Sequence, residues 1–444
     1  MKSDDALLAA WAETLARKRD TAAIFGPHGM VLRSFGDIES RATELAEKID
    51  RTTAGQVYPI DLGNHPDWPS LLLACLRRRV VALPLEETIT PQQREAALRI
   101  CGVRDARDWG EHPPVLLKLT SGTTAAPRAI RFRSEQLLAD CHQICETMGM
   151  GANDINFGVI PLSHSYGFSN LVTPLLARGV ALVLSRDRMP RAVLDDLATS
   201  GATVFPGMPV FYQAFCEMEK PPALPGLRLC ISAGAPLPLE VARKFREKFR
   251  HSIHSFYGSS ECGGICYDRE AELEESGFVG PPMVGVKIEM LETNAVSRIR
   301  VQSGAAGDGY FPEPDPQKLG HGFFAPDDLL SRSDAGYRIV GRVSDVINVA
   351  GKKVNPAEVE AELLRFDGVR AAVVFGRESV LRNEEVAACV AAGAAVRETE
   401  LLEFCRQRLS GWQVPKRIFF VDEIPVNDRG KISRRELAQR FSSR

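Results

Sequence analysis

Apolar runs of strand type alternate with helical patterns through roughly the first 260 residues, and this alternation limits the possible folds more than any other feature of the sequence. The runs "GVALVLSRD" from Gly179, "GATVFPG" from Gly201 and "LRLCISAG" from Leu227 are typical of strands, and "PLEVARKFREKF", which follows them, is typical of a helix. Strands that alternate with helices indicate an α/β architecture. We therefore expect a large N-terminal domain of layered α/β sheets.

The pattern changes towards the C-terminus. The loop-rich stretch "GAAGDGYFPEPDPQKLGHG", Gly304 to Gly322, first interrupts the alternation. The sequence then predicts a helix over "NPAEVEAELLRFDG", with Asn355 as N-cap and Gly368 as its end, followed by a strand, a second helix and another strand. We expect a small α+β C-terminal domain over residues 343–444, joined near Ser344 to the N-terminal domain over residues 1–342.

The composition argues against several classes of partner and location. The 444 residues are 44% hydrophobic and 25% charged, with a formal net charge of −2, so the charge gives no reason to expect nucleic acid or an anionic membrane as partner. The N-terminus lacks the apolar core of a signal peptide, and the longest purely apolar run, "VAACVAAGAAV" from Val386, is well short of the roughly 20 residues that span a bilayer. We expect a soluble, cytoplasmic protein without a membrane span.

Ten cysteines are scattered through the chain without a CxxC pair, which favours reduced and mostly buried thiols over disulfides. Two C-x3-C pairs and one His-x2-His pair are present, but no set of four ligands has the spacing of a zinc site. We therefore expect no zinc.

The stretch "KLTSGTTAAPRAIRF", Lys118 to Phe132, is the first candidate for chemistry. It lies between a strand-like run and a helix predicted to begin near Ser134, and its small polar residues offer N–H groups and hydroxyls that can surround a phosphate. The stretch lacks the G-x4-G-K-[ST] pattern of the P-loop. On these residues alone, a polar turn between strand and helix is the alternative.

Six further stretches follow this loop in order. They are "IPLSHSYGF" from Ile160, "SAGAPLP" from Ser232, "YGSSECGG" from Tyr257, "GFFAPDDL" from Gly322, "GRVSDVINVAGKKVNPAEVE" from Gly341 and "VNDRGKISRREL" from Val426. Together with the loop, they resemble the motifs of the adenylate-forming superfamily of acyl- and aryl-CoA synthetases, peptide-synthetase adenylation domains and luciferases. Acyl- and aryl-CoA synthetases are the most similar. The resemblance extends from about residue 60 to the C-terminus, and it implies a small barrel-like part in the large domain and a mobile small domain.

The resemblance implies an AMP-forming acid–thiol ligase. Such an enzyme uses ATP and Mg2+ to convert a carboxylic acid into an acyl-adenylate with release of pyrophosphate, and then transfers the acyl group to a thiol, for which CoA is the expected co-substrate. Two alternatives stay open, namely direct loading of a phosphopantetheinyl carrier protein and a non-ligase binding relative. A hydrolase has less support because the G-x-S-x-G elbow is absent.

The resemblance also implies roles for individual residues in catalysis. Lys431 is expected to bridge the carboxylate and the α-phosphate, and a lysine suits this task because its point charge sits on a flexible stem. Ser260 is expected beside the α-phosphate, and Glu261 is the expected Mg2+ ligand, a hard oxygen donor that suits this ion. The residues expected to hold the β- and γ-phosphates are Thr120, Ser121, Gly122, Thr123, Thr124 and Arg128.

Adenine and ribose have their own expected contacts. Tyr257 resembles the aromatic residue that stacks on adenine, and Asp328 resembles the aspartate that binds the ribose hydroxyls, with Arg342 reaching the same sugar. Asp327 competes with Asp328 for this role. The further residues expected to bind AMP are Gly234, Ala235, Pro236, Gly258 and Ser259.

The acid and the thiol are expected at neighbouring segments. His164, Tyr166 and Ala233 are expected to line the acyl pocket, and because a histidine does not pair with an ammonium group as an aspartate does, we expect an acid without an α-amino group. A flat, apolar slot would favour an aromatic or unsaturated acyl part. The small domain is expected to rotate about Ser344 and bring Gly351 to the active site, so that the thiol can enter.

This chain departs from the family pattern at several of these positions. Arg128 replaces the usual lysine and keeps its charge, whereas Ala125 and Ala129 replace glycines and predict a stiffer loop. Ser260 replaces a threonine, and Ser344 stands where relatives more often have Asp or Lys.

Overall fold

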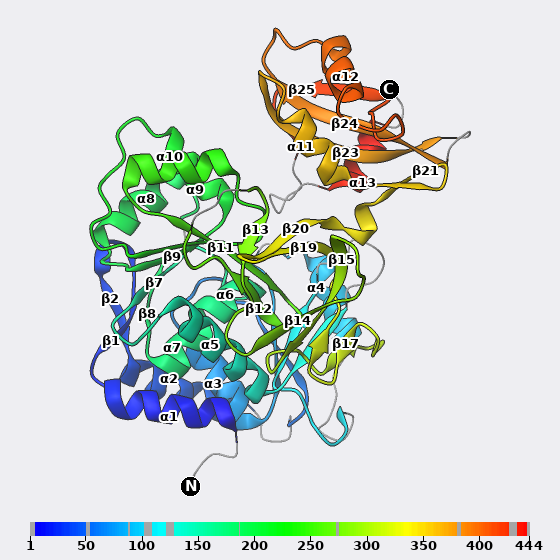
Figure 1. Ribbon diagram of the computed structural model, residues 1–444. Helices are drawn as coiled ribbons and strands as arrows, with labels where there is room; N and C mark the ends of the chain where they lie inside the picture. The colour runs from blue at the N-terminus through cyan, green and yellow to red at the C-terminus, as the bar shows by residue number, and fades with distance from the viewer. Residues whose placement is uncertain are drawn as a thin grey trace. The chain divides into compact units, whose positions relative to one another are not determined.

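The computed structural model describes residues 5–49, 54–87, 89–101, 109–120, 128–185, 187–271, 275–379, 383–425 and 433–441. The chain forms two compact units, and Figure 1 labels the elements of both. The larger unit comprises Met1–Glu289, Arg300–Pro326 and Ser333–Arg338, and the smaller comprises Met290–Ile299, Asp327–Arg332 and Ile339–Arg444.

An eight-stranded sheet forms the centre of the larger unit, in the order β12-β11-β10-β9-β7-β8-β1-β2. Its strands are β1 (Ala22–Phe25), β2 (Val31–Ser34), β7 (Ile155–Gly158), β8 (Ala181–Leu184), β9 (Val204–Gly207), β10 (Leu229–Ser232), β11 (Ile253–Ser259) and β12 (Gly263–Tyr267). The strands from β11 to β1 are parallel, and β12 and β2 pair antiparallel at the two edges. The strands expected from the apolar runs therefore belong to one mainly parallel sheet.

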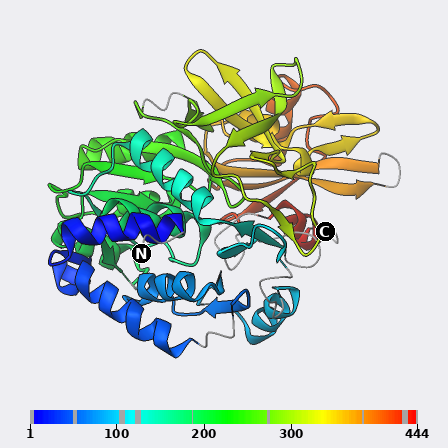
Figure 2. The same ribbon diagram turned by 90° about the horizontal axis from the view of Figure 1, so that it is seen from below.

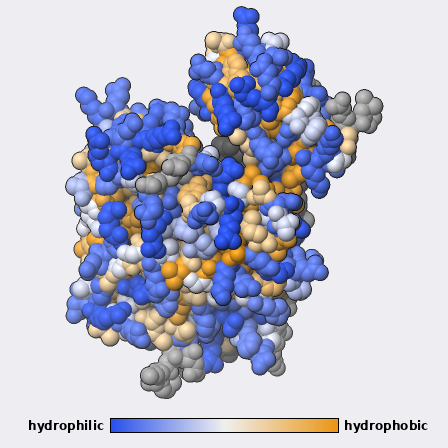
Figure 3. Space-filling model, viewed as in Figure 1, coloured by the Kyte–Doolittle hydropathy of each residue, from blue (hydrophilic) through white to orange (hydrophobic). Residues whose placement is uncertain are grey.

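Helices cover both faces of this sheet (Figure 1). The helices α8 (Pro190–Thr199), α9 (Pro209–Glu217) and α10 (Leu239–Phe249) lie together on one face, and α5 (Ser134–Met148) and α7 (Thr173–Arg178) lie on the other. In α10 the buried residues are Val241, Phe245 and Phe249, which recur every fourth position and form one apolar stripe. The opposite face of α10 is hydrophilic in Figure 3. The amphipathic sequence of this helix thus fixes the side that faces the core.

An aromatic cluster joins α9 to the sheet near the carboxyl ends of β9 and β10. The buried Tyr212 donates its hydroxyl to the carbonyl oxygens of Phe205, at 3.1 Å, and Ile231, at 2.8 Å. Its ring meets Phe245 of α10 edge-on, with 5.1 Å between the ring centroids. A buried phenol needs such partners, and here it bridges two neighbouring strands.

A second, five-stranded sheet of the larger unit has the order β16-β6-β5-β4-β3. Its strands are β3 (Val57–Ile60), β4 (Val81–Pro84), β5 (Leu116–Leu119), β6 (Ala129–Phe132) and β16 (Gly309–Phe311). The remaining helices of this unit are α1 (Ala6–Lys18), α2 (Phe35–Lys48), α3 (Trp68–Arg78), α4 (Pro91–Cys101) and the short α6 (Ser165–Gly167), and Figure 2 shows α2 and α3 side by side. Strand β16 comes from the loop-rich stretch and pairs Tyr310 with Ile130 of β6.

An antiparallel sheet follows the parallel strands in the sequence, in the order β13-β20-β19-β15-β18-β17 with β14 on β15. Its strands are β13 (Phe278–Gly280), β14 (Val286–Met290), β15 (Val296–Ser303), β17 (Leu319–Gly320), β18 (Phe323–Phe324), β19 (Asp328–Ser333) and β20 (Gly336–Arg342).

The smaller unit has a sheet in the order β22-β21-β24-β23, with β25 parallel to β24. Its elements are β21 (Ile347–Val349), β22 (Lys352–Val354), α11 (Pro356–Leu363), β23 (Val369–Ser379), β24 (Asn383–Ala392), α12 (Glu398–Arg406), β25 (Arg417–Val421) and α13 (Arg434–Arg440). The longest apolar run of the sequence contributes to β24, which neighbours three other strands. The predicted class is confirmed: layered α/β sheets in a larger N-terminal part and a smaller α+β C-terminal part.

Helix α11 ends at Leu363, so the predicted end at Gly368 is wrong. Two tight turns follow the helix, in which Phe366 N donates to Leu363 O and Val369 N donates to Phe366 O. These turns direct Phe366 to the core of the unit, where its ring meets Phe404 edge-on at 5.2 Å. Tertiary packing therefore overrides the helical pattern here. Among the described residues, no helix is both long and apolar enough to cross a membrane.

Candidate active site

Three of the predicted site segments meet at the carboxyl edge of the eight-stranded sheet. Ser232 of β10 is paired with Gly207 of β9 and with Ser255 of β11, so the residues that follow β10 lie between those of its neighbours. The segment after β7 reaches the same edge, because β7 is parallel to β9. The carboxyl edge of a parallel sheet is the usual ligand-binding edge of open α/β folds.

The segment after β7 carries His164 and Tyr166. The ring of His164 accepts a hydrogen bond at Nδ1 from the backbone N–H of Tyr166, at 3.2 Å, and so caps the short helix α6. Tyr166 donates its hydroxyl to Gly207 O at 3.3 Å, and its ring centroid lies 5.9 Å from that of Phe256. Burial raises the pKa of the Tyr166 phenol well above its usual value, which keeps the group neutral. A π-helical turn, Phe168–Val172, follows, a feature frequent at functional sites.

Two serine hydroxyls join this segment to the "YGSSE" segment. Ser165 Oγ donates to Ser260 Oγ at 2.9 Å. The accepting hydroxyl keeps its own proton, which it can donate to a further group. The acyl segment and the segment that carries Ser260 are therefore in direct contact.

The segment after β10 forms the next part of the edge. Ala233 is buried and its N–H donates to Gly207 O at 3.3 Å. Gly234 has a φ of +84°, a left-handed conformation that favours glycine, and it leads into the exposed Ala235 and Pro236. A tight, exposed turn thus follows a fully buried strand.

The "YGSSE" segment comprises the end of β11 and the start of the turn that leads to β12. Tyr257 is buried and paired with Cys266, and Gly258 lies so near the facing strand that a Cβ would be 2.8 Å from Gly263 O. Inside the turn, Ser259 Oγ accepts from the N–H of Cys262 at 3.2 Å. The turn is therefore held by its own hydrogen bonds.

Glu261 lies in this turn and has a partner that the sequence did not reveal. The hydroxyl of Tyr310 donates to Glu261 Oε1 at 3.1 Å, and the N–H of Gly307 donates to Glu261 O at 2.9 Å. Burial raises the pKa of the Glu261 carboxyl, and the hydrogen bond from Tyr310 offsets part of that rise. Strand β16, which the sequence presented only as a loop-rich stretch, thus contributes directly to the site.

The ends of the predicted phosphate loop are closed on each other. Thr120 donates its backbone N–H, at 2.8 Å, and its hydroxyl, at 3.2 Å, to Arg128 O. The guanidinium of Arg128 lies over the ring of Tyr310, 5.0 Å from its centroid. Tyr310 therefore connects the end of the loop with Glu261. The predicted residues Ser121, Gly122, Thr123, Thr124 and Lys431 lie outside the described residues.

A buried cation lies beneath the turn of Glu261, at a position that we did not predict. Lys118 of β5 is 6% exposed, and its Nζ lies 4.7 Å and 5.0 Å from the ring centroids of Phe132 and Phe168. Burial lowers the pKa of Lys118, and the carboxylates of Asp140 and Glu261 oppose that shift. A lysine inside the apolar run "VLLKL" was the sequence signal for this position.

Asp140 is the buried carboxylate that meets the same turn. Its Oδ1 accepts from the N–H of Gly264 at 3.0 Å, and a Cβ on Gly263 would be 2.0 Å from that oxygen. Burial raises the pKa of Asp140, and Lys118 opposes the rise. The pair of glycines after Glu261 therefore leaves the space that this carboxylate fills.

Asn64 is a further residue that the sequence did not indicate. Its Nδ2 donates to Gly158 O at 3.1 Å, and its Oδ1 accepts from Leu162 N at 2.9 Å. The same Nδ2 lies 3.3 Å from Ser185 O, after β8. A buried amide with donors and an acceptor can hold two loops at once, and here it holds the segment that leads to His164.

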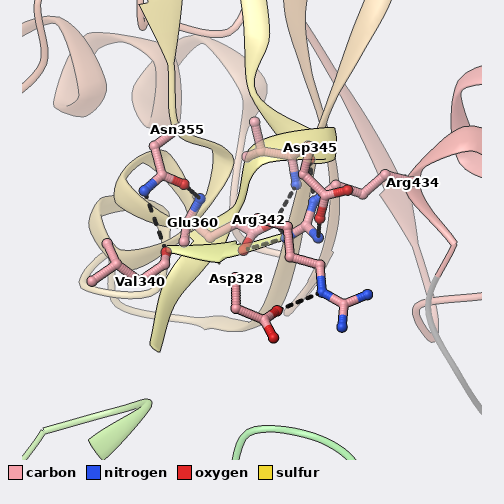
Figure 4. A network of polar contacts seen from close by, with 9 residues as sticks. Asp328, Val340, Arg342, Asp345, Asn355, Glu360 and Arg434 are labelled. Carbon is pink, nitrogen blue, oxygen red and sulfur yellow. Dashed lines mark hydrogen bonds and ion pairs between the residues drawn. The ribbon is translucent and has the colours of Figure 1, made fainter. Parts of the chain in front are cut away.

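In the smaller unit, Asp328 and Arg342 form an ion pair (Figure 4). Arg342 Nε donates to Asp328 Oδ1 at 2.7 Å, and Asp328 is buried whereas the Arg342 side chain is 61% exposed. Asp327 is exposed, and its carbonyl oxygen accepts from Val343 N at 2.7 Å. Two of the three residues expected at the ribose are thus in direct contact.

The predicted hinge and thiol-channel residues lie close together in the chain and belong to different turns. Ser344 is in the 3-10 turn Val343–Asp345, after β20. Gly351 is at the tip of the β21–β22 hairpin with a φ of +86°, and its N–H donates to Asn348 Oδ1 at 2.9 Å. Within the described part of the chain, no cluster of three or more His, Cys, Asp or Glu side chains could hold a metal.

Two family models match this sequence. The model of the AMP-binding enzyme matches residues 104–307, and the model of the AMP-binding enzyme C-terminal domain matches residues 358–431. Feruloyl-CoA synthase of Amycolatopsis sp is 28% identical over 472 aligned positions, which cover 93% of this chain and 95% of the relative. The 3,4-dihydroxybenzoate–[aryl-carrier protein] ligase of Bacillus anthracis is 28% identical over 335 positions, which cover 75% of this chain and 76% of the relative.

Solved structures share the fold at lower identity. ATP-bound MatB from Rhodopseudomonas palustris aligns with a TM-score of 0.85 and 22% identity, covering 98% of both chains. The o-succinylbenzoate CoA synthetase MenE of Bacillus subtilis, in complex with its acyl-adenylate intermediate, aligns with a TM-score of 0.83 and 20% identity, covering 96% of this chain and 97% of that one.

Proposed function

The chain belongs to the AMP-binding enzyme family, and from that premise we propose that it is an AMP-forming ligase that joins a carboxylic acid to a thiol. One observation carries the proposal: the acyl segment and the "YGSSE" turn meet at the carboxyl edge of the sheet through the Ser165–Ser260 hydrogen bond. The reaction has to bring an acid and a nucleotide phosphate into contact, and this edge joins the segments proposed to bind each of them.

The first half-reaction joins two anions. A carboxylate oxygen of the acid attacks the α-phosphorus of ATP, and the bond to the bridging oxygen of pyrophosphate breaks. We assign Ser260 to hydrogen bonding beside the α-phosphate and Lys431 to the charge that develops between acid and phosphate. Donors and charges placed in advance around such a centre are commonly the largest single contribution to catalysis.

The other assignments follow the resemblance of each segment to the family motifs. Tyr257 is proposed to stack on adenine, with the turn of Gly234, Ala235 and Pro236 along its other side and Gly258 and Ser259 nearby. The ribose is assigned to Asp328 and Arg342. The β- and γ-phosphates are assigned to the loop of Thr120, Ser121, Gly122, Thr123, Thr124 and Arg128.

Magnesium fits this set of residues in one position. Glu261 offers a partly buried carboxylate, and the remaining ligands would come from ATP phosphates and water, the arrangement usual for this ion. When bound, the ion supplies charge neutralisation at the phosphates. Tyr310 donates to Oε1 and so restricts how the Glu261 carboxylate can turn.

In the second half-reaction, a thiol attacks the acyl carbon and AMP leaves. We propose CoA as the thiol, which is the acceptor in the name of the feruloyl-CoA relative. We further propose that residues 343–444 act as a mobile domain that turns about Ser344 and carries Gly351 to the thiol channel. Direct loading of a carrier protein is the alternative, which the name of the aryl-carrier ligase supports.

The acid is proposed to be aromatic or unsaturated and to lack an α-ammonium group. The name of the feruloyl-CoA relative, the neutral and partly buried phenol of Tyr166 and the buried Ala233 support this class. His164 uses Nδ1 to accept from the backbone, so its role at the acid would fall to the other ring nitrogen.

Product analysis tests the proposal. The protein with ATP and Mg2+ is given a cinnamate, a medium-chain fatty acid or phenylalanine, each with CoA or with a phosphopantetheinylated carrier protein. We expect AMP and pyrophosphate with the cinnamate and a thioester of CoA. Formation of ADP and phosphate contradicts a ligase of this type, preferential use of phenylalanine contradicts the acid class, and a thioester on the carrier protein alone supports the alternative acceptor.

A further inference from the structure

Arg434, the first residue of α13, joins three other parts of the smaller unit (Figure 4). Its Nη1 donates to Asp345 Oδ2 at 2.7 Å, and its Nη2 donates to Glu360 Oε1 at 2.7 Å and Oε2 at 3.0 Å. Its Nε donates to Val374 O at 2.9 Å. One guanidinium therefore connects the turn after β20, helix α11 and strand β23.

The partners of Arg434 are themselves held in place. Glu360 Oε1 also accepts from the N–H of Val374 at 2.8 Å, so helix α11 and strand β23 are joined without the arginine. The side chains of Arg434, Asp345 and Glu360 are 28%, 26% and 16% exposed. The planar guanidinium of a partly buried arginine, with several charge-assisted hydrogen bonds, holds its partners in a defined relative geometry. A lysine at the same position would do so only in part.

Arg434 also stands near two functional positions in the sequence. Asp345 directly follows the proposed hinge Ser344, and Lys431 precedes Arg434 by three positions. Three residues of chain span at most about 10 Å, so the position of Arg434 limits where Lys431 can reach. We propose that Arg434 is a positioning residue for adenylation: it ties the start of α13 to the residue behind the hinge and thereby limits the region from which Lys431 can act. The inference rests on the proposed function of Lys431.

The thiol step should not depend on this arginine, because the hairpin of Gly351 has its own support. β21 and β22 pair from Ile347–Val354 to Val349–Lys352, and Asn348 N donates to Glu384 Oε2 at 2.7 Å. The N–H of Gly351 donates to Asn348 Oδ1. The two half-reactions therefore separate a positioning role from a general loss of stability.

The test uses the whole protein with Arg434→Met, Arg434→Lys and Lys431→Ala, and Arg406→Met as matched control. Arg406 pairs with Glu403 at 3.0 Å on α12, with both side chains more than half exposed, so its loss should change neither rate. Acid-dependent exchange of labelled pyrophosphate into ATP measures adenylation, and thioester formation from supplied acyl-adenylate measures the second step.

We expect Arg434→Met to lower kcat of exchange by roughly thirtyfold, with KM for ATP and the thioester rate within about twofold of wild type. Arg434→Lys keeps the charge beside Asp345 and Glu360 and should restore part of the exchange rate. If Arg434→Met does not fold, Arg434→Lys must still show the selective loss, in smaller measure.

Unchanged exchange in the folded variants, or an equal loss in both steps, overturns the proposal. An Arg434 defect without any defect in Lys431→Ala also overturns it, because the effect would then not pass through the lysine. Failure of the proposed function is a different result, since the wild-type protein itself would then show no exchange with any acid.

Discussion

Ser165 and Ser260 form the contact on which the proposed chemistry depends most closely. A serine hydroxyl rotates more freely than that of a β-branched threonine, whose χ1 is restricted. The family pattern has threonine at position 260, so the hydroxyl of Ser260 in this chain lacks the χ1 restriction of the family residue. Ser165, which donates to Ser260 Oγ at 2.9 Å, supplies a substitute: it fixes the accepting oxygen and leaves the proton of Ser260 for the phosphate.

Removing the donor should therefore weaken adenylation. We expect Ser165→Ala to lower kcat/KM for the acid in pyrophosphate exchange by about fivefold, corresponding to about 1 kcal/mol for one net hydrogen bond. In a Ser260→Thr background, Ser165→Ala should lower the same kcat/KM by less than twofold, because the χ1 preference of threonine already restricts its hydroxyl. A double-mutant cycle measures the difference. Equal losses in both backgrounds would show that Ser165 does not act through Ser260.

At the scale of elements, the two edges of the parallel sheet differ in role: one carries the proposed site and the other a stabilising polar network. The proposed site lies at the carboxyl edge, whereas the amino edge carries a polar network at the starts of β7, β9 and β10. Asp154 accepts from Arg228 Nε at 2.7 Å and Nη2 at 2.6 Å, and from the hydroxyl of Thr203 at 2.8 Å. The N–H of Gly151 donates to the second oxygen at 2.9 Å. This network joins the beginnings of three strands.

The network should contribute to stability in a way that depends on pH. Burial acts to raise the pKa of Asp154, but the hydrogen bonds from Arg228, Gly151 and Thr203 outweigh it and hold the pKa below its ordinary value. A carboxyl group whose pKa is lower in the folded state stabilises the folded protein at pH values above its pKa in the unfolded chain. This contribution is lost as the pH falls through the pKa of the folded state. The loss should therefore occur below about pH 4.

Asp154→Asn should lower the free energy of unfolding by about 2 kcal/mol at pH 7, since it removes a carboxylate that is 10% exposed and accepts two hydrogen bonds from the charged Arg228. Denaturant unfolding at several pH values measures this difference, which should shrink below about pH 4. Asp195→Asn is the control, because Asp195 pairs with Arg191 on the surface and should change stability by less than about 0.5 kcal/mol. If the loss of unfolding free energy in Asp154→Asn does not vary with pH, the lowered pKa of Asp154 is not the source of its contribution to stability.

The sequence predicted the segments of the site better than the contacts between them. The resemblance to the family motifs identified the segments of Tyr166, Ala233 and Glu261, and parallel pairing brings those segments together. Tyr310 and Asn64 were not predicted. Tyr310 acts across 49 positions and Asn64 across 98, and both lie in polar, loop-like stretches that resemble ordinary surface turns.

The two buried charges beneath the site were missed for a different physical reason. Lys118 is in an apolar strand run and Asp140 is in a helix, and charged residues are usually exposed. The opposite charge near Lys118 could not be identified, because nothing local links a strand residue to a helix residue about twenty positions later. The glycines at 263 and 264 were a signal of close approach, but they did not indicate which side chain fills the space.

At the scale of the whole molecule, the proposal assigns one half-reaction to each face of a mobile C-terminal domain. Lys431 would serve adenylation, and the hairpin of Gly351 would serve thiol entry. In the described hairpin, Gly351 has a left-handed φ of +86° and open space around the position of a Cβ. A side chain added there would strain the backbone and project from the tip.

Two variants should therefore have opposite effects. Lys431→Ala should raise the activation free energy of adenylation by about 3 to 4 kcal/mol. It should leave the rate of thiol attack on supplied acyl-adenylate nearly unchanged. Gly351→Leu should slow thiol attack and leave pyrophosphate exchange nearly unchanged. Rates of both half-reactions, with melting temperatures to check folding, measure these effects. If each variant slows both steps to the same extent, a single static site explains the data better than a domain that turns.

The central claim is that the acid is activated as an acyl-adenylate, and an oxygen label tests it most directly. An acid labelled with 18O in its carboxylate is incubated with the protein, ATP, Mg2+ and CoA, and the AMP is isolated for mass spectrometry. The carboxylate oxygen that attacks the α-phosphorus stays on AMP when the thiol attacks the acyl carbon. The account predicts one labelled oxygen in each AMP. Unlabelled AMP, or label found in inorganic phosphate, would contradict it.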